Sequence, residues 1–259
     1  MSIVMVGSEL YELLPWDSEF FGVPIARMVG HHADTHRLTD AVNGCRARGI
    51  ACLYFLASSD DPTTVRSAED CGFRLVDVRV TLRHSLHSIP KGDSTASAAS
   101  DHPIFLASSE DAAALADLVG DSFQHSRFYF DPGFPRDRCR ALYRTWLLKS
   151  CHGGADAVFV AGPLDAPAGY ATCTLRDSGQ RAELGLMGVA DEFRGRGLGV
   201  KLVRSLLTWC QERGVASVDV VTQGRNLAAQ RLYQRCGFLT TDVKLWYHCW
   251  LDPGQDPYE

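Results

Sequence analysis

Apolar and polar residues follow patterns along the chain that predict an α/β protein. In the second half, short apolar runs predict strands at 103–107, 157–161, 170–175, 183–189, 217–222 and 242–250. Periodic apolar positions predict helices at 108–123, 135–149, 228–235 and in the segment that ends at Arg213. The turn Asp177-Ser178-Gly179 predicts that the strands beside it are antiparallel. We therefore expect a mixed, largely antiparallel sheet flanked by helices.

The chain also contains an internal echo. CRARGIACLYFLASS (45–59) matches CQERGVASVDVVTQG (210–224), and CGFRLVDVRVTL (71–82) matches CGFLTTDVKLWY (236–247), at one constant offset without a gap. We interpret this as a degenerate duplication, although any α/β unit places glycine after a helix and valine-rich runs after glycine. Ala68 stands where the second copy has Tyr233, and Asp61 where it has Asn226. The first copy is therefore expected to have lost its function.

A change of composition divides the chain. Residues 85–102 are rich in Ser, Ala, Gly and Pro and lack apolar periodicity, which is typical of a linker. We predict a smaller N-terminal α/β domain at 1–84, a linker at 85–102 and a larger domain at 103–259.

Composition and net charge limit the classes of partner that the protein could bind. Hydrophobic residues make up 46% of the chain, charged residues 22%, and the net charge is −5, which disfavours nucleic acids and anionic membranes as partners. A signal peptide and a long apolar run are not evident, so we expect a cytoplasmic protein. Nine cysteines are scattered singly, and the neighbouring His31, His32 and His36 are typical of a solvated loop. We therefore expect no metal.

A glycine-rich turn follows the predicted strand 183–189. The segment Arg194-Gly195-Arg196-Gly197-Leu198-Gly199 places flexible backbone and free N–H groups at a helix start, where they can bind a phosphate. Its spacing is not that of a nucleotide hydrolase, and a dinucleotide fingerprint would need its third glycine at Val200 or Leu202. ATP and NAD are thus poorly supported. A flexible turn without a ligand is the alternative.

A polar pair lies on the next predicted helix. Asn226 can cap its start, and Tyr233 lies about two turns further on, so both side chains fall on one face. Taken separately, Asn226 is more often only a cap and Tyr233 a packed aromatic.

The two motifs together resemble the GNAT superfamily of N-acetyltransferases. R-G-R-G-L-G at a strand-to-helix junction is followed about thirty residues later by N-x-A-A-x-x-L-Y-x-x-x-G-F. The resemblance implies acetyl-CoA as co-substrate. It implies contacts to the pyrophosphate from Arg194, Gly195, Arg196, Gly197, Leu198 and Gly199, to the pantetheine arm from the strand Leu186, Met187, Gly188 and Val189, and to the cofactor from Asn226 and Ala229.

The resemblance also implies catalytic roles for Tyr233, Asn226 and Glu183. The residue matching Tyr233 protonates the departing thiolate, and that matching Asn226 contacts the cofactor or an ordered water. A thiol has a pKa near ~8.5 and a phenol near ~10, so a modest local shift suffices. Glu183 occupies the place of the general base in some relatives, and strand alternation predicts that it shares a face with Met187. A water relay is the alternative.

A closer resemblance spans nearly the whole chain. Residues 14–23, Ser126-Arg127-Phe128 with Asp131-Pro132, and residues 142–146 are similar to bacterial dTDP-4-amino-4,6-dideoxygalactose (dTDP-fucosamine) N-acetyltransferases. This implies acetylation of the amine of a nucleotide-linked deoxyamino sugar destined for a surface polysaccharide. Arg127, Phe128 and Tyr129 are the expected acceptor contacts, by charge and ring stacking. We expect residues 125–134 to form a loop, and packing of this loop onto the sheet by its aromatic residues is the alternative.

Two other functions stay open. A GNAT enzyme can acetylate another amine, such as a protein N-terminus, a lysine or an antibiotic. A protein of this fold can also bind acyl-CoA without turnover, although the intact Tyr233 and Asn226 argue against it. The aromatic C-terminal strand 245–250 favours a homodimer if it is an edge, and a buried central strand is the alternative.

Overall fold

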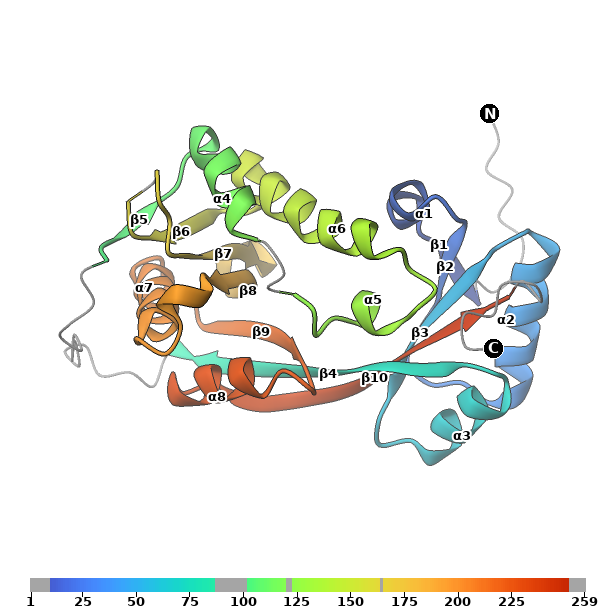
Figure 1. Ribbon diagram of the computed structural model, residues 1–259. Helices are drawn as coiled ribbons and strands as arrows, with labels where there is room; N and C mark the ends of the chain where they lie inside the picture. Colours follow the sequence, from blue (N-terminus) through green and yellow to red (C-terminus); the bar gives the residue numbers. More distant parts are fainter. Residues whose placement is uncertain (1–9, 87–101, 120–122, 164, 252–259) are drawn as a thin grey trace. The chain divides into compact units, whose positions relative to one another are not determined.

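The computed structural model describes residues 10–86, 102–119, 123–163 and 165–251 of the chain (Figure 1). These residues belong to two compact units that exchange segments. The first unit comprises Met1–Arg79, His125–Cys139 and Val243–Glu259, and the second comprises Val80–Gln124 and Arg140–Asp242. Most of the predicted linker, residues 87–101, lies outside the described residues, so the boundaries at 84 and 103 stay a prediction.

The first unit is a sheet covered by helices. Its elements are β1 (Tyr11–Leu13), α1 (Pro15–Phe21), β2 (Ile25–Met28), α2 (Thr35–Ala47), β3 (Cys52–Ser58), α3 (Pro62–Asp70), α5 (Arg127–Phe130) and parts of β4 (Arg74–Ser85) and β10 (Leu239–Trp250). The strand order is β1-β2-β3-β10-β4. β2 and β3 are parallel, whereas β1 with β2 and β3 with β10 are antiparallel.

Side-chain alternation gives this sheet two different faces. Leu53 and Phe55 of β3 and Tyr247 of β10 pack with buried residues of α2 and α3 in one apolar core. The intervening residues, among them Tyr54 and His248, lie on the other face, where their rings stack 4.4 Å apart. The second face therefore combines aromatic and polar groups.

The second unit holds the remaining elements. They are β5 (Ile104–Leu106), α4 (Ala112–Leu118), most of α6 (Arg136–Lys149), β6 (Ala157–Ala161), β7 (Gly169–Arg176), β8 (Arg181–Val189), α7 (Leu198–Glu212), β9 (Ser217–Gln223), α8 (Leu227–Arg235) and the other parts of β4 and β10. The order is β10-β4-β9-β8-β7-β6-β5. β5 to β8 form antiparallel pairs, and β8 with β9 is parallel. The expected mixed, largely antiparallel sheet is confirmed.

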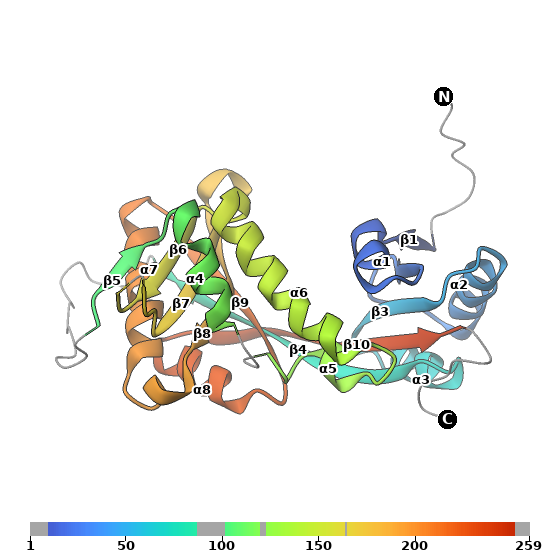
Figure 2. The ribbon, with the colours of Figure 1, turned by 45° about the horizontal axis from the view of Figure 1, so that its top comes forward.

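The echo seen in the sequence recurs as structure. α2, β3, α3 and β4 correspond to α7, β9, α8 and β10, and both long strands are visible in Figure 2. The glycines after the helices have positive φ in both copies, at Gly49 and Gly214 and again at Gly72 and Gly237. Only glycine adopts this conformation without strain, so the same residue ends the same helix twice. The match in local geometry favours duplication over coincidence.

Three local expectations needed correction. The segment 125–134, expected as a loop, contains the short helix α5. α4 ends at Leu118 rather than near 123, and residues 120–122 lie outside the described residues. β10 lies between β3 and β4, so it is a central strand and not a free edge. The expectation of a homodimer through this strand therefore loses its basis.

None of the helices in the described ranges is long and apolar enough to cross a membrane.

Candidate active site

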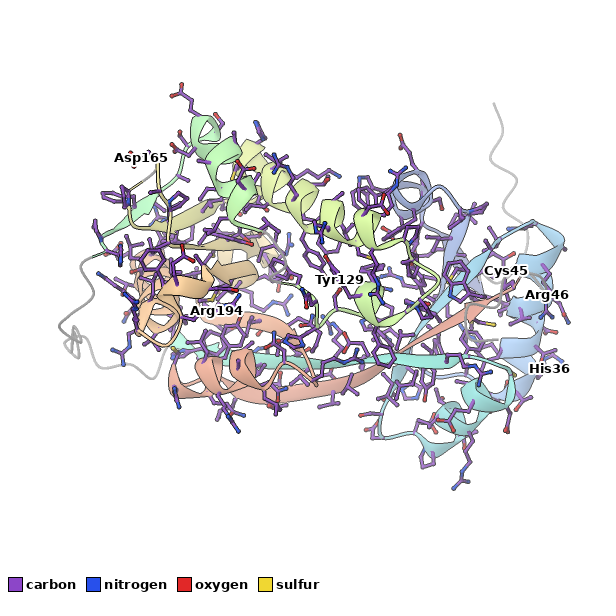
Figure 3. All side chains as sticks on the ribbon, in the orientation of Figure 1. His36, Cys45, Arg46, Tyr129, Asp165 and Arg194 are labelled. Carbon is purple, nitrogen blue, oxygen red and sulfur yellow. The ribbon has the colours of Figure 1, made fainter. Side chains whose placement is uncertain are left out.

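The glycine turn before α7 presents unused backbone donors. Gly195 and Gly197 have φ values of +74° and +81°, which few other residues adopt. Gly197 begins α7 without a side-chain cap. Within the described residues, the amides from Gly195 to Val200 find no acceptor. Arg194 and Arg196 are exposed beside them, and Figure 3 labels Arg194. This arrangement of amides, helix start and guanidinium groups suits a pyrophosphate.

β8 contains a bulge ahead of this turn. Ala171 of β7 lies opposite Met187, whereas Cys173 lies opposite Leu184, so β8 carries one extra residue. The amide of Leu186, within the bulge, donates to the hydroxyl of Thr172 at 2.8 Å. The bulge therefore changes the direction of the backbone immediately before Met187.

β8 also separates from β9 at the bulge. Their parallel pairing runs from Arg181 with Ser217 to Leu184 with Val220 and is not continued. On this side, residues 186–189 have no backbone partner in the described part of β9, although they still pair with β7. An extended polar chain can bind such an edge through main-chain hydrogen bonds. The pantetheine arm of coenzyme A has amide groups suited to it.

Tyr233 lies beside this opening. It is 6% exposed, and its hydroxyl lies 4.0 Å from the sulfur of Met187. Burial, followed by the nearby Cys236, raises the pKa of the Tyr233 phenol above its ordinary value. The shift is thus opposite to the lowering that would ease proton transfer, although the phenol stays protonated at neutral pH.

Asn226 serves as the predicted cap of α8. Its side-chain oxygen accepts from the amide of Ala229 at 3.1 Å. This bond uses one lone pair of the oxygen, so the second lone pair and the side-chain NH2 group can both contact a ligand.

Glu183 does not share a face with Met187. Residues that pair across two strands point to the same face of the sheet. Met187 pairs with Ala171 and Leu184 with Cys173, so Met187 and Leu184 share one face, and Glu183 lies on the other face. The expectation from regular alternation was wrong because the bulge shifts it by one residue. Glu183 is ion-paired with Arg176 at 3.1 Å, and its side chain is 42% exposed.

Arg127, Phe128 and Tyr129 lie together on α5 of the first unit. Phe128 is 3% exposed and stacks on Phe21 at 5.1 Å, so its ring belongs to the core. Arg127 and Tyr129 are half-buried, and Figure 3 labels Tyr129. The guanidinium of Arg127 lies 4.2 Å from the ring centre of Trp246. α5 thus combines the charge of Arg127 with the half-buried ring of Tyr129, over which the guanidinium of Arg136 lies at 5.8 Å.

Comparison with known protein families identifies the domain that contains this site. The family described as acetyltransferase (GNAT) matches residues 119–238, which include the bulged strand, the glycine turn and Tyr233. Residues 119–238 form a GNAT acetyltransferase domain. Members of this family are acyl-CoA-dependent N-acetyltransferases, in agreement with the resemblance found in the sequence motifs.

Two curated relatives of this chain have names that refer to a polysaccharide or an amino sugar. Spore coat polysaccharide biosynthesis protein SpsD of Bacillus subtilis is 31% identical over 146 residues, covering 56% of this chain and 49% of that protein. The dTDP-fucosamine acetyltransferase of Escherichia coli O6:H1 is 25% identical over 240 residues, covering 92% of this chain and 96% of that protein. The chain thus spans about half the length of the first and nearly all of the second.

Solved structures show the GNAT fold over most of the chain. A tandem GNAT protein from the clavulanic acid biosynthesis pathway has a TM-score of 0.61 at 17% identity, covering 90% of this chain and 77% of that one. A GCN5-related N-acetyltransferase from Sphaerobacter thermophilus has a TM-score of 0.64 at 17% identity, covering 94% and 76%. At these identities the likeness concerns the fold alone.

The first copy of the echo lacks the glycine turn and the tyrosine of the second copy. At the offset of the echo, Asp34 stands where the second copy has Gly199, and its carboxylate caps α2 by accepting from the amide of Arg37 at 2.9 Å. A carboxylate at the helix start satisfies the donors and repels a phosphate. Ala68, in place of Tyr233, is fully buried.

Sequence reasoning missed a polar cluster in the first unit. Asp131 and His248 are both fully buried and hydrogen-bonded, and Trp250 also donates to Asp131. Asp131 was noted only as part of Asp131-Pro132, and His248 and Trp250 only within an aromatic strand. Their alternation with Tyr247 and Cys249 was the available signal, because it places both on the face opposite the apolar core.

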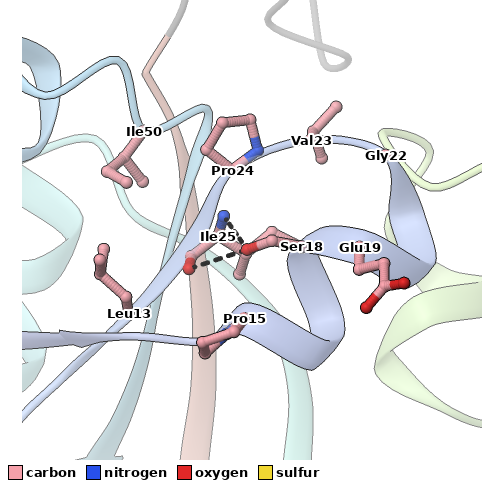
Figure 4. A pocket seen from close by; sticks show the side chains of 9 residues that line it. All are labelled: Leu13, Pro15, Ser18, Glu19, Gly22, Val23, Pro24, Ile25 and Ile50. Carbon is pink, nitrogen blue, oxygen red and sulfur yellow. Dashed lines mark hydrogen bonds between the residues drawn. The ribbon is translucent and has the colours of Figure 1, made fainter.

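Two other features of the first unit lack the chemistry of a site. A shallow cavity of about 500 Å³ is lined mainly by apolar residues (Figure 4). The hydroxyl of Ser18 in its wall already accepts a hydrogen bond from the backbone amide of Ile25. His31 and His32 contact Leu56 and Asp61. Across the described ranges, His, Cys, Asp and Glu form no group of three that could hold a metal ion.

Proposed function

We propose that this chain transfers an acetyl group from acetyl-CoA to the amine of a nucleotide-linked deoxyamino sugar. The observation that carries the use of acetyl-CoA is the separation of β8 from β9 immediately before an uncapped glycine turn. One feature suits the pantetheine amides and the other the pyrophosphate. The pair lies within the GNAT domain.

Each half of coenzyme A has its own proposed contacts. The pyrophosphate binds the amides of residues 195–199 together with Arg194 and Arg196. The pantetheine arm pairs with the backbone of residues 186–189, and Asn226 and Ala229 at the start of α8 contact the cofactor. Gly199 leaves little room for a side chain, because an added Cβ would lie 3.3 Å from Cε of Met187 and 3.2 Å from Cδ2 of Leu232.

The proposed chemistry is direct attack by the acceptor amine on the thioester carbonyl. An amide of β8 polarises the carbonyl oxygen and stabilises the negative charge of the tetrahedral intermediate. Collapse of the intermediate expels the coenzyme A thiolate, to which Tyr233 gives its proton. Because burial disfavours a free phenolate here, the proton is expected to move as the carbon–sulfur bond breaks rather than beforehand.

The amine must lose a proton before or during its attack. Glu183 is the candidate from family position, whereas a water relay is the alternative. The ion pair of Glu183 with Arg176 and its place on the face away from Met187 favour the water relay.

The acceptor class rests on the relatives and on α5. The similarity to a dTDP-fucosamine acetyltransferase extends over 92% of the chain, including the first unit, and SpsD is named for spore coat polysaccharide biosynthesis. Arg127 offers a cation for a diphosphate and Tyr129 a ring for a base or sugar, while Phe128 supports the helix from the core. The product would enter a surface polysaccharide.

Thiol release from acetyl-CoA, followed with a chromogenic disulfide, tests this function. The acceptors are dTDP-4-amino-dideoxysugars, basic peptides and aminoglycosides. Turnover confined to the sugar nucleotides supports the proposal, and turnover with another amine keeps the acetyltransferase but refutes the acceptor. If acetyl-CoA binds while no acceptor reacts, the non-catalytic function is favoured instead.

A further inference from the structure

A chain of buried polar groups in the first unit ends at Arg127. Asp131 and His248 are both fully buried. Nδ1 of His248 lies 2.6 Å from Oδ2 of Asp131, and Nε2 lies 3.0 Å from Nη1 of Arg127. A guanidinium can only donate and a carboxylate can only accept, so Nδ1 carries the hydrogen and Nε2 the lone pair. His248 is therefore neutral and held in one tautomer.

The carboxylate at the start of this chain is fixed by further donors. Oδ1 of Asp131 accepts from the amide of Gly133 at 2.9 Å, and Oδ2 accepts from Nε1 of Trp250 at 3.1 Å. Several hydrogen bonds compensate its burial and prevent its rotation. The imidazole of His248 is also stacked on Tyr54. The direction of the Nε2 lone pair of His248 is therefore fixed by β10, by β3 and by the segment that follows α5.

Arg127 is held in place but keeps free donors. Its guanidinium carbon lies 4.4 Å from the ring centre of Tyr54 and 4.2 Å from those of Phe128 and Trp246. Apart from the bond to His248, its hydrogens find no acceptor in the described part of the chain. Asp17 of α1 is near enough to interact electrostatically, but no ion pair joins it to Arg127 within the described ranges.

A neutral imidazole holds arginine differently from a carboxylate. A carboxylate partner would cancel the positive charge, whereas the lone pair of His248 fixes one nitrogen and leaves the charge intact. Three aromatic rings near the half-buried guanidinium reduce its contact with water, which strengthens its attraction to an anion. The remaining N–H groups lie in the plane that suits two oxygens of one phosphate.

We infer that Asp131 and His248 are positioning residues that aim the Arg127 guanidinium at the diphosphate of the acceptor. This inference rests on the proposed acceptor class. It explains why Asp131 and His248 are buried on the aromatic and polar face of the sheet of the first unit. A purely structural role, in which Arg127 only fastens α5 to β10, is the competing explanation.

The test compares two acceptors in the full-length enzyme: the nucleotide-linked amino sugar and the same amino sugar without its nucleotide. Arg127→Gln should raise KM for the nucleotide-linked sugar about 10-fold or more, because it removes charge-assisted hydrogen bonds. KM for the free sugar should stay within about twofold of the wild type if the phosphates alone are affected. Arg127→Lys should restore little, because lysine lacks the planar fork.

The positioning residues are tested in the same assay. His248→Phe keeps a ring but removes the acceptor for Arg127, and should raise KM for the nucleotide-linked sugar about 2- to 10-fold. His248→Gln can again offer an oxygen to Arg127 and should recover part of the loss. The matched control is His84→Phe, which replaces a buried histidine of the second unit and should not change the ratio of the two KM values.

The outcomes separate failure of the inference from failure of the proposed function. If His248→Phe lowers only the melting temperature, or shifts both KM values equally, the positioning role is refuted. Calorimetric binding of thymidine diphosphate to the wild type and to Arg127→Gln does not depend on turnover. Weaker binding by the variant supports the anion site even if the acetylated amine differs, and equal binding overturns it. If His248→Phe does not fold, Arg127→Gln and His248→Gln decide the matter.

Discussion

The hydroxyl of Tyr233 lies 4.0 Å from the sulfur of Met187, and no stronger polar partner for it occurs in the described part of the chain. Met187 belongs to the stretch of β8 that separates from β9. A buried phenol with only a thioether beside it retains its proton and its capacity to donate. This is the arrangement expected of a general acid that acts only when a ligand arrives.

Replacement of Tyr233 by phenylalanine should therefore separate chemistry from binding. We expect Tyr233→Phe to lower kcat about 100-fold, because the substitution removes the proposed proton donor for the thiolate. The dissociation constant for acetyl-CoA should change less than about threefold, because the contact matters only at collapse of the intermediate. Pre-steady-state kinetics and calorimetry measure the two quantities. Equal losses in both would indicate a packing role.

The glycine turn gives a prediction with an internal control. Gly197 has a φ of +81° and Gly214 a φ of +72°, and an added Cβ would meet no atom within 4 Å at either position. Alanine should cost about 1–2 kcal/mol of backbone strain at both. Gly197→Ala should also weaken acetyl-CoA binding about fivefold or more, because it moves the pyrophosphate donors. Gly214→Ala should leave that affinity unchanged, and equal affinities in the two variants would count against this site.

Glu183 provides a prediction about the base. Its carboxylate is ion-paired with Arg176 and lies on the face of β8 away from Met187. We expect Glu183→Gln to reduce kcat less than about threefold, well below the effect of losing a general base. The pH dependence of kcat/KM should keep its shape. A loss of about 100-fold, with the acidic limb of the profile abolished, would restore Glu183 as the base.

The buried pair of the first unit predicts how stability depends on pH. Burial is the main cause that lowers the pKa of His248 from 6.5 to about 4, with Arg127 contributing, although Asp131 opposes the shift. Between these values the unfolded chain binds more protons than the native state, so stability falls as the pH falls from 6.5 to 4. The pKa of Asp131 is lowered by its bond to His248 despite burial, which adds a further loss below pH 3.8.

Thermal denaturation from pH 7 to pH 4 tests this dependence. The melting temperature of the wild type should fall across the window, and that of His248→Gln should fall less steeply because this group no longer titrates. Parallel curves for the two proteins would show that another group carries the proton uptake.

Much of the fold was evident from local patterns. The strand 157–161 appears with the same bounds as β6, and the predicted helix 135–149 differs from α6 by one residue. Asn226 caps α8 as its residue type and position predicted. Helix caps, glycine stops and apolar periodicity depend on neighbours within a few residues, which is why the sequence alone reveals them.

The differences from expectation came from strand pairing, which periodicity along a single strand does not reveal. The bulge in β8 depends on its pairing with β7 and moved Glu183 to the other face. The central position of β10 depends on β3 and β4 and removed the edge that a dimer would have used. β3 and β4 lie far from β10 in the chain. β7 directly precedes β8, but a bulge in their pairing cannot be read from the apolar periodicity of either strand.

The sequence by itself determined the mixed α/β sheet, the duplicated elements and the residues of the glycine turn and α8, because these follow from local propensity and spacing. The GNAT family was indicated by the resemblance of its motifs. Only the tertiary structure decided that β8 leaves β9 beside that turn and that Asp131, His248 and Arg127 form one hydrogen-bonded chain. Hydrogen bonds between groups more than a hundred residues apart depend on the packing of whole elements. That packing minimises the free energy of the entire chain and is not encoded in any single segment.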